Sequence, residues 1–315
     1  MTSAIHVSNL KKTYPGRPPV EAVRGLDLDV PVGECFGLLG PNGAGKTTTL
    51  EILEGLIDAT SGEVEILGLR WDRDEAAIRR RIGISLQETR LSDKLTVHET
   101  VTLFRSFYKT GLTPEAAIDA VSLGEKARTY VTKLSGGQKQ RLAVACALVG
   151  DPELIFLDEP TTGLDPQSRR QLWDVIRSLN ERGRTVVLTT HYMDEAERLC
   201  NRVAVVDAGK VIAIGSPQQL INDLGGEHVI EFTTAEKLSD EVFAKLKALS
   251  TVQSARPEGM GTLLAVKEPH VALPALLDFL RAHAVSLAGL TTRTATLEDV
   301  FVSLTGRHLR EGEGS

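Results

Sequence analysis

A glycine-rich stretch followed by a lysine and two threonines gives this sequence its clearest chemistry. It runs Gly40, Pro41, Asn42, Gly43, Ala44, Gly45, Lys46, Thr47 and Thr48, and its first eight residues fit the phosphate-loop pattern G-x-x-x-x-G-K-[ST]. Because glycine lacks a Cβ atom, the backbone N–H groups of such a loop can turn inward around an anion. Lys46 can reach the outer phosphates of a nucleotide, and the Thr47 hydroxyl can ligate Mg²⁺. The stretch therefore predicts a nucleotide-binding loop.

The residues on either side of this loop predict the elements that position it. Residues 35–39 form an apolar run typical of a buried strand, and residues 48–53 continue with the pattern of a helix. The positive end of that helix dipole would face the bound phosphates.

Two carboxylates close another apolar run, at residues 154–159. Asp158 and Glu159 stand at its C-terminal end, and ligands bind beyond that end of the strands in open α/β sheets. We expect Asp158 to hold Mg²⁺ through water and Glu159 to activate the attacking water. Gln87 and His191 each end a further apolar run. Gln87 is either an ordinary edge residue or a contact to Mg²⁺, and His191 is either a local hydrogen-bonding group or part of the same crevice.

A second helix start carries two consecutive glycines. Leu134, Ser135, Gly136, Gly137 and Gln138 precede an apolar helical pattern, and Ser135 and Gln138 have capping-box spacing. The stretch is either a plain capped helix or a second anion-binding helix end, which the glycines favour. Tyr14 is equally open on local sequence, because it is either a turn residue packed on the first sheet or a platform for adenine.

The bulk composition bounds the remaining classes. The chain has 315 residues, 42% of them apolar, and a formal net charge of −6, whereas proteins that bind nucleic acid without sequence preference are usually basic. Cys35, Cys146 and Cys200 lie far apart, which suggests a reducing cytoplasm. No apolar run approaches the roughly 18 residues of a membrane helix. If the protein works at a membrane, we therefore expect another chain to cross it.

The order of patterns predicts two domains with the boundary at Gly225 and Gly226. The first, residues 1–225, is α/β, with residues 88–133 interpreted as helical and a helical subdomain at about 88–150. The second, residues 226–315, has the order strand–helix–strand–strand–helix–strand, which is compatible with a ferredoxin-like layer. A last helix from Leu297 to Leu304 has one apolar face, which suggests packing against a partner surface.

Over about residues 4–222 this sequence resembles an ATP-binding cassette ATPase. Residues 40–47 are similar to its Walker A motif, Gln87 to the Q-loop, and Leu134–Gln138 to the full LSGGQ signature. Residues 154–159 are similar to Walker B with the catalytic Glu159, residues 163–166 around Asp165 to the D-loop, and His191 to the switch histidine. Tyr14 stands where the family keeps its adenine-stacking aromatic residue.

This resemblance implies a phosphate-loop NTPase core with a mixed sheet, an antiparallel β subdomain and a helical subdomain, followed by the small α+β domain. It implies that ATP and Mg²⁺ are the cofactors, with the metal held by Thr47, Gln87 and Asp158. Two subunits would pair head to tail in a homodimer, so that Ser135 of one faces the γ-phosphate held by Lys46 of the other. ATP would close the dimer, and hydrolysis with Glu159 as base would reopen it.

The C-terminal extension and its Leu-Glu-Asp-Val-Phe tail resemble those of daunorubicin-resistance-type exporter ATPases. That resemblance implies a separate transmembrane permease, a peripheral location on the cytoplasmic face of the membrane, and a drug or lipid-like cargo. The extension could equally serve only to stabilise the dimer. The alternative is a soluble cassette ATPase acting on ribosomes or nucleic acid. The single cassette, the compact insertion and the acidic balance disfavour that class, so we expect no nucleic-acid partner.

Overall fold

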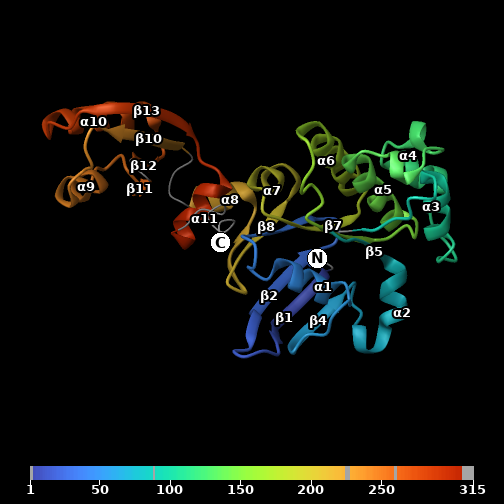
Figure 1. Cartoon of the computed structure of the whole chain (residues 1–315). Coiled ribbons are helices and arrows are strands. Elements are labelled where there is room, and N and C mark those ends of the chain that lie inside the picture. The colour runs from blue at the N-terminus through green and yellow to red at the C-terminus, as the bar shows by residue number, and fades with distance from the viewer. Residues whose placement is uncertain (1–2, 88, 224–227, 259–260, 307–315) are drawn as a thin grey trace. The chain divides into compact units, whose positions relative to one another are not determined.

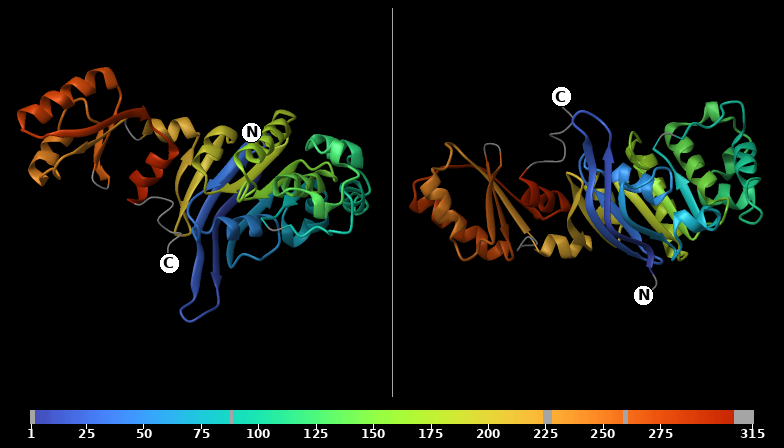
Figure 2. Two further views of the ribbon diagram at one scale, coloured as in Figure 1. Left: turned by 45° about the horizontal axis from the view of Figure 1, so that its top comes forward. Right: turned by 90° about the horizontal axis from the view of Figure 1, so that it is seen from below.

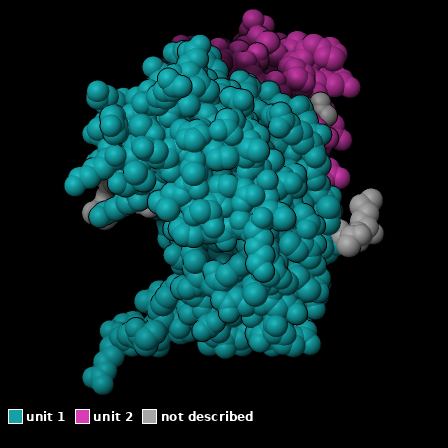
Figure 3. All heavy atoms as spheres, turned by 90° about the vertical axis from the view of Figure 1, so that its right-hand side faces the viewer, with its two compact units in different colours: residues 1–214, 310–315 teal, residues 215–309 magenta. Residues whose placement is uncertain are grey.

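The computed structural model describes residues 3–87, 89–223, 228–258 and 261–306. They fall into two compact units, divided between Ile214 and Gly215 and shown in different colours in Figure 3. The predicted boundary at Gly225 and Gly226 lies outside the described residues, and the short helix before it belongs to the second unit. Within the described ranges, every helix is too short or too polar to cross a lipid bilayer.

The described part of the first unit spans residues 3–214 and is built on two sheets. An antiparallel sheet has the order β2 (Val20–Pro31), β1 (Ser3–Tyr14) and β4 (Ser61–Ile66). A six-stranded sheet has the order β5 (Ile82–Ser85), β6 (Leu154–Asp158), β7 (Thr185–Thr190), β3 (Cys35–Leu39), β8 (Arg202–Asp207) and β9 (Lys210–Gly215). The pairings from β5 to β8 are parallel, so these five strands end at one edge of the sheet.

Seven helices accompany these sheets (Figure 1). They are α1 (Lys46–Leu53), α2 (Trp71–Arg81), α3 (Val97–Arg105), α4 (Pro114–Ala120), α5 (Gly136–Leu148), α6 (Pro166–Glu181) and α7 (Met193–Leu199). Both views of Figure 2 place the green helices α3 and α4 at one end of this unit. The interpretation of residues 88–133 as helical was too broad. Turns and two single 3₁₀ turns, at Gly124–Lys126 and Val131–Lys133, separate and follow the helices, and Glu88 lies outside the described residues.

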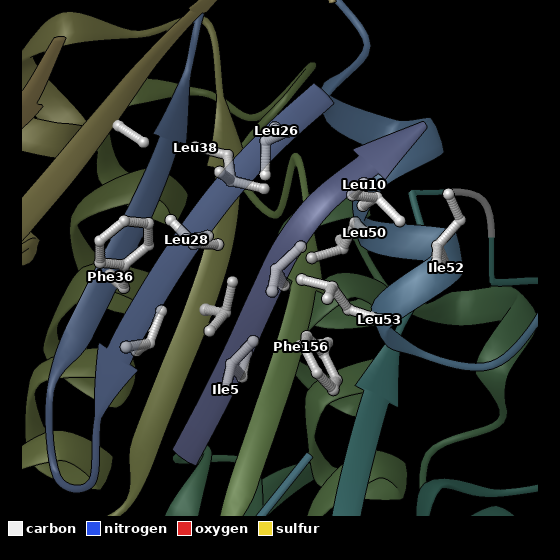
Figure 4. Close-up of a cluster of buried hydrophobic side chains, with 14 of the residues drawn as sticks. Ile5, Leu10, Leu26, Leu28, Phe36, Leu38, Leu50, Ile52, Leu53 and Phe156 are labelled. Atoms are coloured by element: carbon white, nitrogen blue, oxygen red, sulfur yellow. The ribbon is translucent and has the colours of Figure 1, made fainter. Parts of the chain in front are cut away.

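The main core of this unit lies between the two sheets and around α1. Figure 4 shows side chains from β1, β2, β3, β6 and α1 meeting there. Phe36 and Phe156 are fully buried, as are Leu50 and Leu53 on the inner face of α1. Burying a side chain of this size contributes roughly 1.5–3 kcal/mol. Because α1 begins directly at Lys46, this packing also fixes the position of the phosphate loop.

The second unit contains a four-stranded antiparallel sheet with the order β11 (Ser254–Glu258), β12 (Gly261–Val266), β10 (His228–Thr234) and β13 (Leu287–Thr294). Its helices are α8 (Pro217–Asp223), α9 (Asp240–Lys247), α10 (Pro269–Ala282) and α11 (Leu297–Thr305). The predicted strand–helix–strand–strand–helix–strand order is confirmed. The sheet order, with the first strand beside the third and fourth, is that of a ferredoxin-like layer.

The tail helix α11 corrects one expectation. Leu297, Val300 and Phe301 were expected to face a partner surface, but they are buried within the single chain and only Leu304 remains exposed. Asp299 helps to explain this. It accepts hydrogen bonds from Arg293 and Arg256 of the neighbouring sheet and closes a capping box with Thr296. The helix is therefore fastened to its own unit.

Candidate functional site

The phosphate loop connects β3 to α1 and depends on glycine at two close approaches. A Cβ atom on Gly40 would lie 2.2 Å from the Val206 carbonyl oxygen, and one on Gly45 would lie 2.4 Å from the Ala22 carbonyl oxygen. Gly45 also has a positive φ of 100°. The backbones of β8 and β2 therefore pack closely against the loop and hold its conformation.

Lys46 lies at the first turn of α1 and is almost fully buried. Its Nζ donates hydrogen bonds to the carbonyl oxygens of Gly40 and Pro41, at 2.8 and 3.1 Å, and lies 3.6 Å from Oε1 of Glu159. Burial lowers the pKa of Lys46, whereas the charges of Glu159 and Asp158 raise it. The ammonium is thus desolvated and directed into the loop, where a phosphate would meet it.

Asp158 is the last residue of β6 and lies beside the start of α1. The Thr47 hydroxyl is 3.4 Å from its Oδ1, and the Thr189 hydroxyl at the end of β7 donates a hydrogen bond to the same oxygen. Burial raises the pKa of Asp158, and the hydrogen bond from Thr189 opposes that rise. Carboxylate and hydroxyl oxygens at this separation are the donor types that Mg²⁺ prefers, so these residues fit the metal.

Glu159 follows directly and has a positive φ of 43°, uncommon for a residue with a side chain. Its N–H donates a 2.9 Å hydrogen bond to the Thr189 hydroxyl, and the Thr162 hydroxyl donates to Oε2 at 3.0 Å. The unusual backbone is thus supported from two neighbouring segments. In this conformation the carboxylate lies 3.6 Å from Nζ of Lys46.

His191 and Gln87 complete the group around this carboxylate. Nδ1 of His191 lies 3.2 Å from Oε2 of Glu159, and Nε2 of Gln87 lies 3.5 Å from the same oxygen. The contact with His191, followed by the charge of Lys46, lowers the pKa of Glu159 to about 2 despite its burial. The structure therefore brings five predicted residues together: Lys46 at the start of α1, Asp158 and Glu159 at the end of β6, Gln87 after β5, and His191 after β7.

Gln87 does not stand at the strand end itself. The strand β5 ends at Ser85, and Gln87 is an exposed residue two positions later. Tyr14 was placed in a turn, but it is the last residue of β1 and pairs with Val20. The hairpin is longer than the local pattern indicated, because β1 continues to Tyr14 and β2 already begins at Val20. Ala22, whose carbonyl oxygen abuts the phosphate loop, lies on β2 two residues after Val20.

The glycine-rich helix start lies elsewhere in the unit. Ser135 caps α5 in a full capping box with Gln138, as its spacing predicted. Within the described part of the chain, no hydrogen bond or ion pair joins Leu134–Gln138 to Gly40–Thr48. Gly137 packs instead on Ser168 of α6, where a Cβ atom would lie 2.4 Å from the Ser168 side chain.

Asp165 caps α6 next to this contact. Its Oδ1 accepts hydrogen bonds from the N–H groups of Gln167 and Ser168, and its Oδ2 accepts one from the Ser168 hydroxyl. Those hydrogen bonds, the Ser168 hydroxyl first, lower the pKa of Asp165. The predicted D-loop residue therefore orders the segment that lies beside the glycine-rich helix start.

Sequence reasoning missed the residues that support the group around Glu159. Thr189 contacts both Asp158 and Glu159, and Thr162 contacts Glu159. The sequence pattern that could have indicated Thr189 is its position near the end of β7, beside the strand that ends in the two carboxylates. Neighbouring parallel strands bring such ends together.

Comparisons with known proteins agree with this geometry. The family model described as ABC transporter matches residues 23–162. The linearmycin resistance ATP-binding protein LnrL of Bacillus subtilis is 35% identical over 98% of this chain and 100% of its own length. The Nod factor export ATP-binding protein I of Cupriavidus metallidurans is 40% identical over 99% of this chain and 100% of its own length.

Solved structures agree as well. The dimeric post-hydrolysis state of the ATP-binding cassette MJ0796, bound to ADP and Pi, is 32% identical with a TM-score of 0.61 and covers 67% of this chain and 98% of its own. The match extends over most of the chain in the relatives and over a whole cassette in the structure. The chain therefore belongs to the ABC transporter family and is an ATP-binding ATPase.

Proposed function

We propose that this chain powers an exporter by binding and hydrolysing ATP between two of its own copies. The observation that carries the proposal is the divided site. Lys46, Asp158, Glu159 and His191 lie together at one site, whereas the glycine-rich helix start at Ser135 contacts none of them. A second copy, turned head to tail, would bring its Ser135 to the γ-phosphate held by Lys46.

The electrostatics suggest how ATP would prepare the site. Lys46 lies against Glu159, and their attraction helps to keep the pKa of that carboxyl at about 2. Phosphate oxygens would draw the Lys46 ammonium toward themselves, which removes this contact and adds negative charge nearby. Both changes raise the pKa of Glu159, so its carboxylate becomes a better base when the substrate is bound.

Several other groups would position the reactants. The backbone N–H groups of residues 43–48 would hold the phosphates, and His191 would hold Glu159 and the γ-phosphate in register. Thr47, Asp158 and Gln87 would hold Mg²⁺, directly or through water. The metal would supply charge neutralisation between the outer phosphates. Tyr14 would lie against adenine, and Asp165 would face the partner subunit.

Coupling to a membrane chain would use exposed apolar side chains of the segment that follows Gln87 in the sequence. Residues 88–105 include α3, on which Leu103 is 46% exposed, and Phe107 just beyond this range is 72% exposed. The Phe107 ring stacks edge-on against Phe104 with ring centroids 6.1 Å apart. Apolar side chains at this exposure are suited to a helix of a membrane partner.

We therefore place the protein at the cytoplasmic face of the membrane, bound to a separate permease. Relatives are named for linearmycin resistance and for Nod factor export, which supports export of a drug or a lipid-like compound. The C-terminal unit would stabilise or regulate the dimer.

Cysteine cross-linking tests the coupling surface. All three native cysteines are buried, so a cysteine introduced at Leu103 or Phe107 offers the more reactive thiol. In the complex purified from membranes, these variants should cross-link to the permease. A cysteine at Val20, which is 60% exposed on β2, serves as the control and should not. Equal labelling of Val20 and Phe107 variants without any cross-link would contradict the proposed docking.

A further inference from the structure

Glu195, in the first turn of α7, is a buried acid that the site described above does not use. The residue is 0% exposed, and the indole Nε1 of Trp173 donates a 2.9 Å hydrogen bond to its Oε1. Burial raises the pKa of Glu195. The hydroxyl of Thr190, the indole of Trp173, the hydroxyl of Thr161 and the charge of Arg169 lower it. A carboxylate held in this way is costly to bury, which invites a functional reason.

The groups around Glu195 come from the three segments that control the site. Thr190 directly precedes His191, and Thr161 lies between Glu159 and the D-loop. Arg169 and Trp173 belong to α6, the helix that Asp165 caps. Through Trp173 the carboxylate is hydrogen-bonded to the helix behind the D-loop, and the groups that lower its pKa include the residue before His191 and the chain that follows Glu159.

A stack of side chains continues from α6 to the switch histidine. The guanidinium carbon of Arg169 lies 4.3 Å from the centre of the Tyr192 ring, which is cation–π distance. The Tyr192 ring lies 4.1 Å from the His191 ring, measured between centroids, with 42° between their planes. The Tyr192 N–H also donates a 2.9 Å hydrogen bond to the Thr190 hydroxyl. Arg169 thus reaches His191 through Tyr192, and Glu195 through its charge.

We infer that Glu195 and Arg169 are positioning residues that hold the His191 ring against Glu159 and join its placement to α6. The inference rests on the role proposed above for His191. A shift of α6, for instance when Asp165 meets a second subunit, would move Arg169 and with it the Tyr192–His191 stack. Through its hydrogen bond with Trp173, Glu195 would transmit the same shift from α6 to α7, whose N-cap is Tyr192.

The simplest contrary view makes Glu195 a packing residue only. In that case its replacement would lower the stability of the unit and leave the hydrolysis rate of the folded protein unchanged. Kinetic measurements therefore distinguish the two views, provided that the hydrolysis rate is measured per folded molecule and compared with that of variants at exposed neighbouring positions.

The test uses conservative variants of the full-length protein in its ATPase reaction. Glu195→Gln keeps the shape and an acceptor for Trp173 but removes the ionisable carboxyl group, and Arg169→Met removes the cation over Tyr192. Asp194→Asn and Arg170→Met, both at exposed neighbouring positions, are the matched controls. We expect kcat to fall about tenfold or more in the first pair, because small misplacements of catalytic groups carry large costs, while KM for ATP changes little. The controls should keep the unaltered rate.

A double-variant cycle with His191→Ala identifies the route. If Glu195 and Arg169 act through His191, adding Glu195→Gln to His191→Ala should slow hydrolysis no further. A full additional loss would overturn the inference, as would unaltered rates in both single variants when His191→Ala is slow. If His191→Ala itself keeps the full rate, the role proposed for His191 is refuted first. Tyr192→Leu, compared with Tyr192→Phe, carries the same test if Glu195→Gln does not fold.

Discussion

Glu54 gives the sharpest prediction about stability. It closes α1, is 0% exposed, and neither of its carboxyl oxygens has a hydrogen-bond partner among the described residues. Burial, followed by the charges of Asp158 and Glu51, raises its pKa from 4.5 to about 8. At neutral pH the folded protein therefore keeps a proton on Glu54 that the unfolded chain releases.

The sign and size of the effect follow from this difference. Between the unfolded pKa and about pH 8 the folded state binds the additional proton, so the free energy of unfolding falls as pH rises. The slope is about 1.4 kcal/mol per pH unit at most, and the contribution between pH 5 and pH 7 amounts to about 2.5 kcal/mol. Glu54→Gln cannot ionise and lacks this slope. It should be more stable than the unaltered protein by a margin that widens with pH.

Urea unfolding at pH 5, 6, 7 and 8 measures the margin. Both tryptophans, Trp71 and Trp173, lie in the first unit, so their fluorescence follows the unit that contains Glu54. Trp71 also donates a hydrogen bond to the carbonyl of Leu53, next to Glu54. Glu63→Gln, an exposed acid on β4, is the control and should change neither stability nor slope. Parallel pH profiles for Glu54→Gln and the unaltered protein would refute the reasoning.

Three further predictions concern the site and the C-terminal unit. Lys46→Met should abolish ATP binding measured by calorimetry, because the loop loses its only buried cation among the described residues; unaltered affinity would contradict this. Because the pKa of Glu159 is about 2, protonation of Glu159 should not lower kcat/KM for ATP at any pH above 5. A fall of kcat/KM in that range that disappears in Glu159→Gln would contradict this prediction. Asp299→Asn should weaken the hold of Arg293 and Arg256 and destabilise the C-terminal unit by about 3 kcal/mol. Faster hydrogen exchange in β10–β13 would be the readout, and unchanged protection would count against it.

Local patterns were enough to predict the loop between β3 and α1 and the capped helix start at Ser135. The phosphate loop and the capping box at Ser135 are short-range chemistry, since each is set by the spacing of a few neighbouring residues. The convergence of Lys46, Asp158 and Glu159 was also predictable, because parallel strands end at one edge of their sheet.

Burial of single acids was not predictable in the same way. Glu54 and Glu195 stand in short, acid-containing helices that look solvated in sequence, and only packing against other elements removes them from water. The apolar face of α11 shows the converse. The helix and its apolar face were predicted correctly from the periodicity, but the sequence does not say whether that face packs on its own unit or on a partner.

The divided site is the central claim, and the mass of Glu159→Gln in solution with and without MgATP tests it most directly. Removing the base should leave ATP binding intact and keep the closed state from turning over. The account predicts a monomer without nucleotide and a dimer of twice the 34.1 kDa chain mass with MgATP. Adding Ser135→Arg, at the helix start that should face the partner's phosphate, should abolish that dimer. ATP binding that leaves the protein monomeric, or a dimer indifferent to Ser135→Arg, would contradict it.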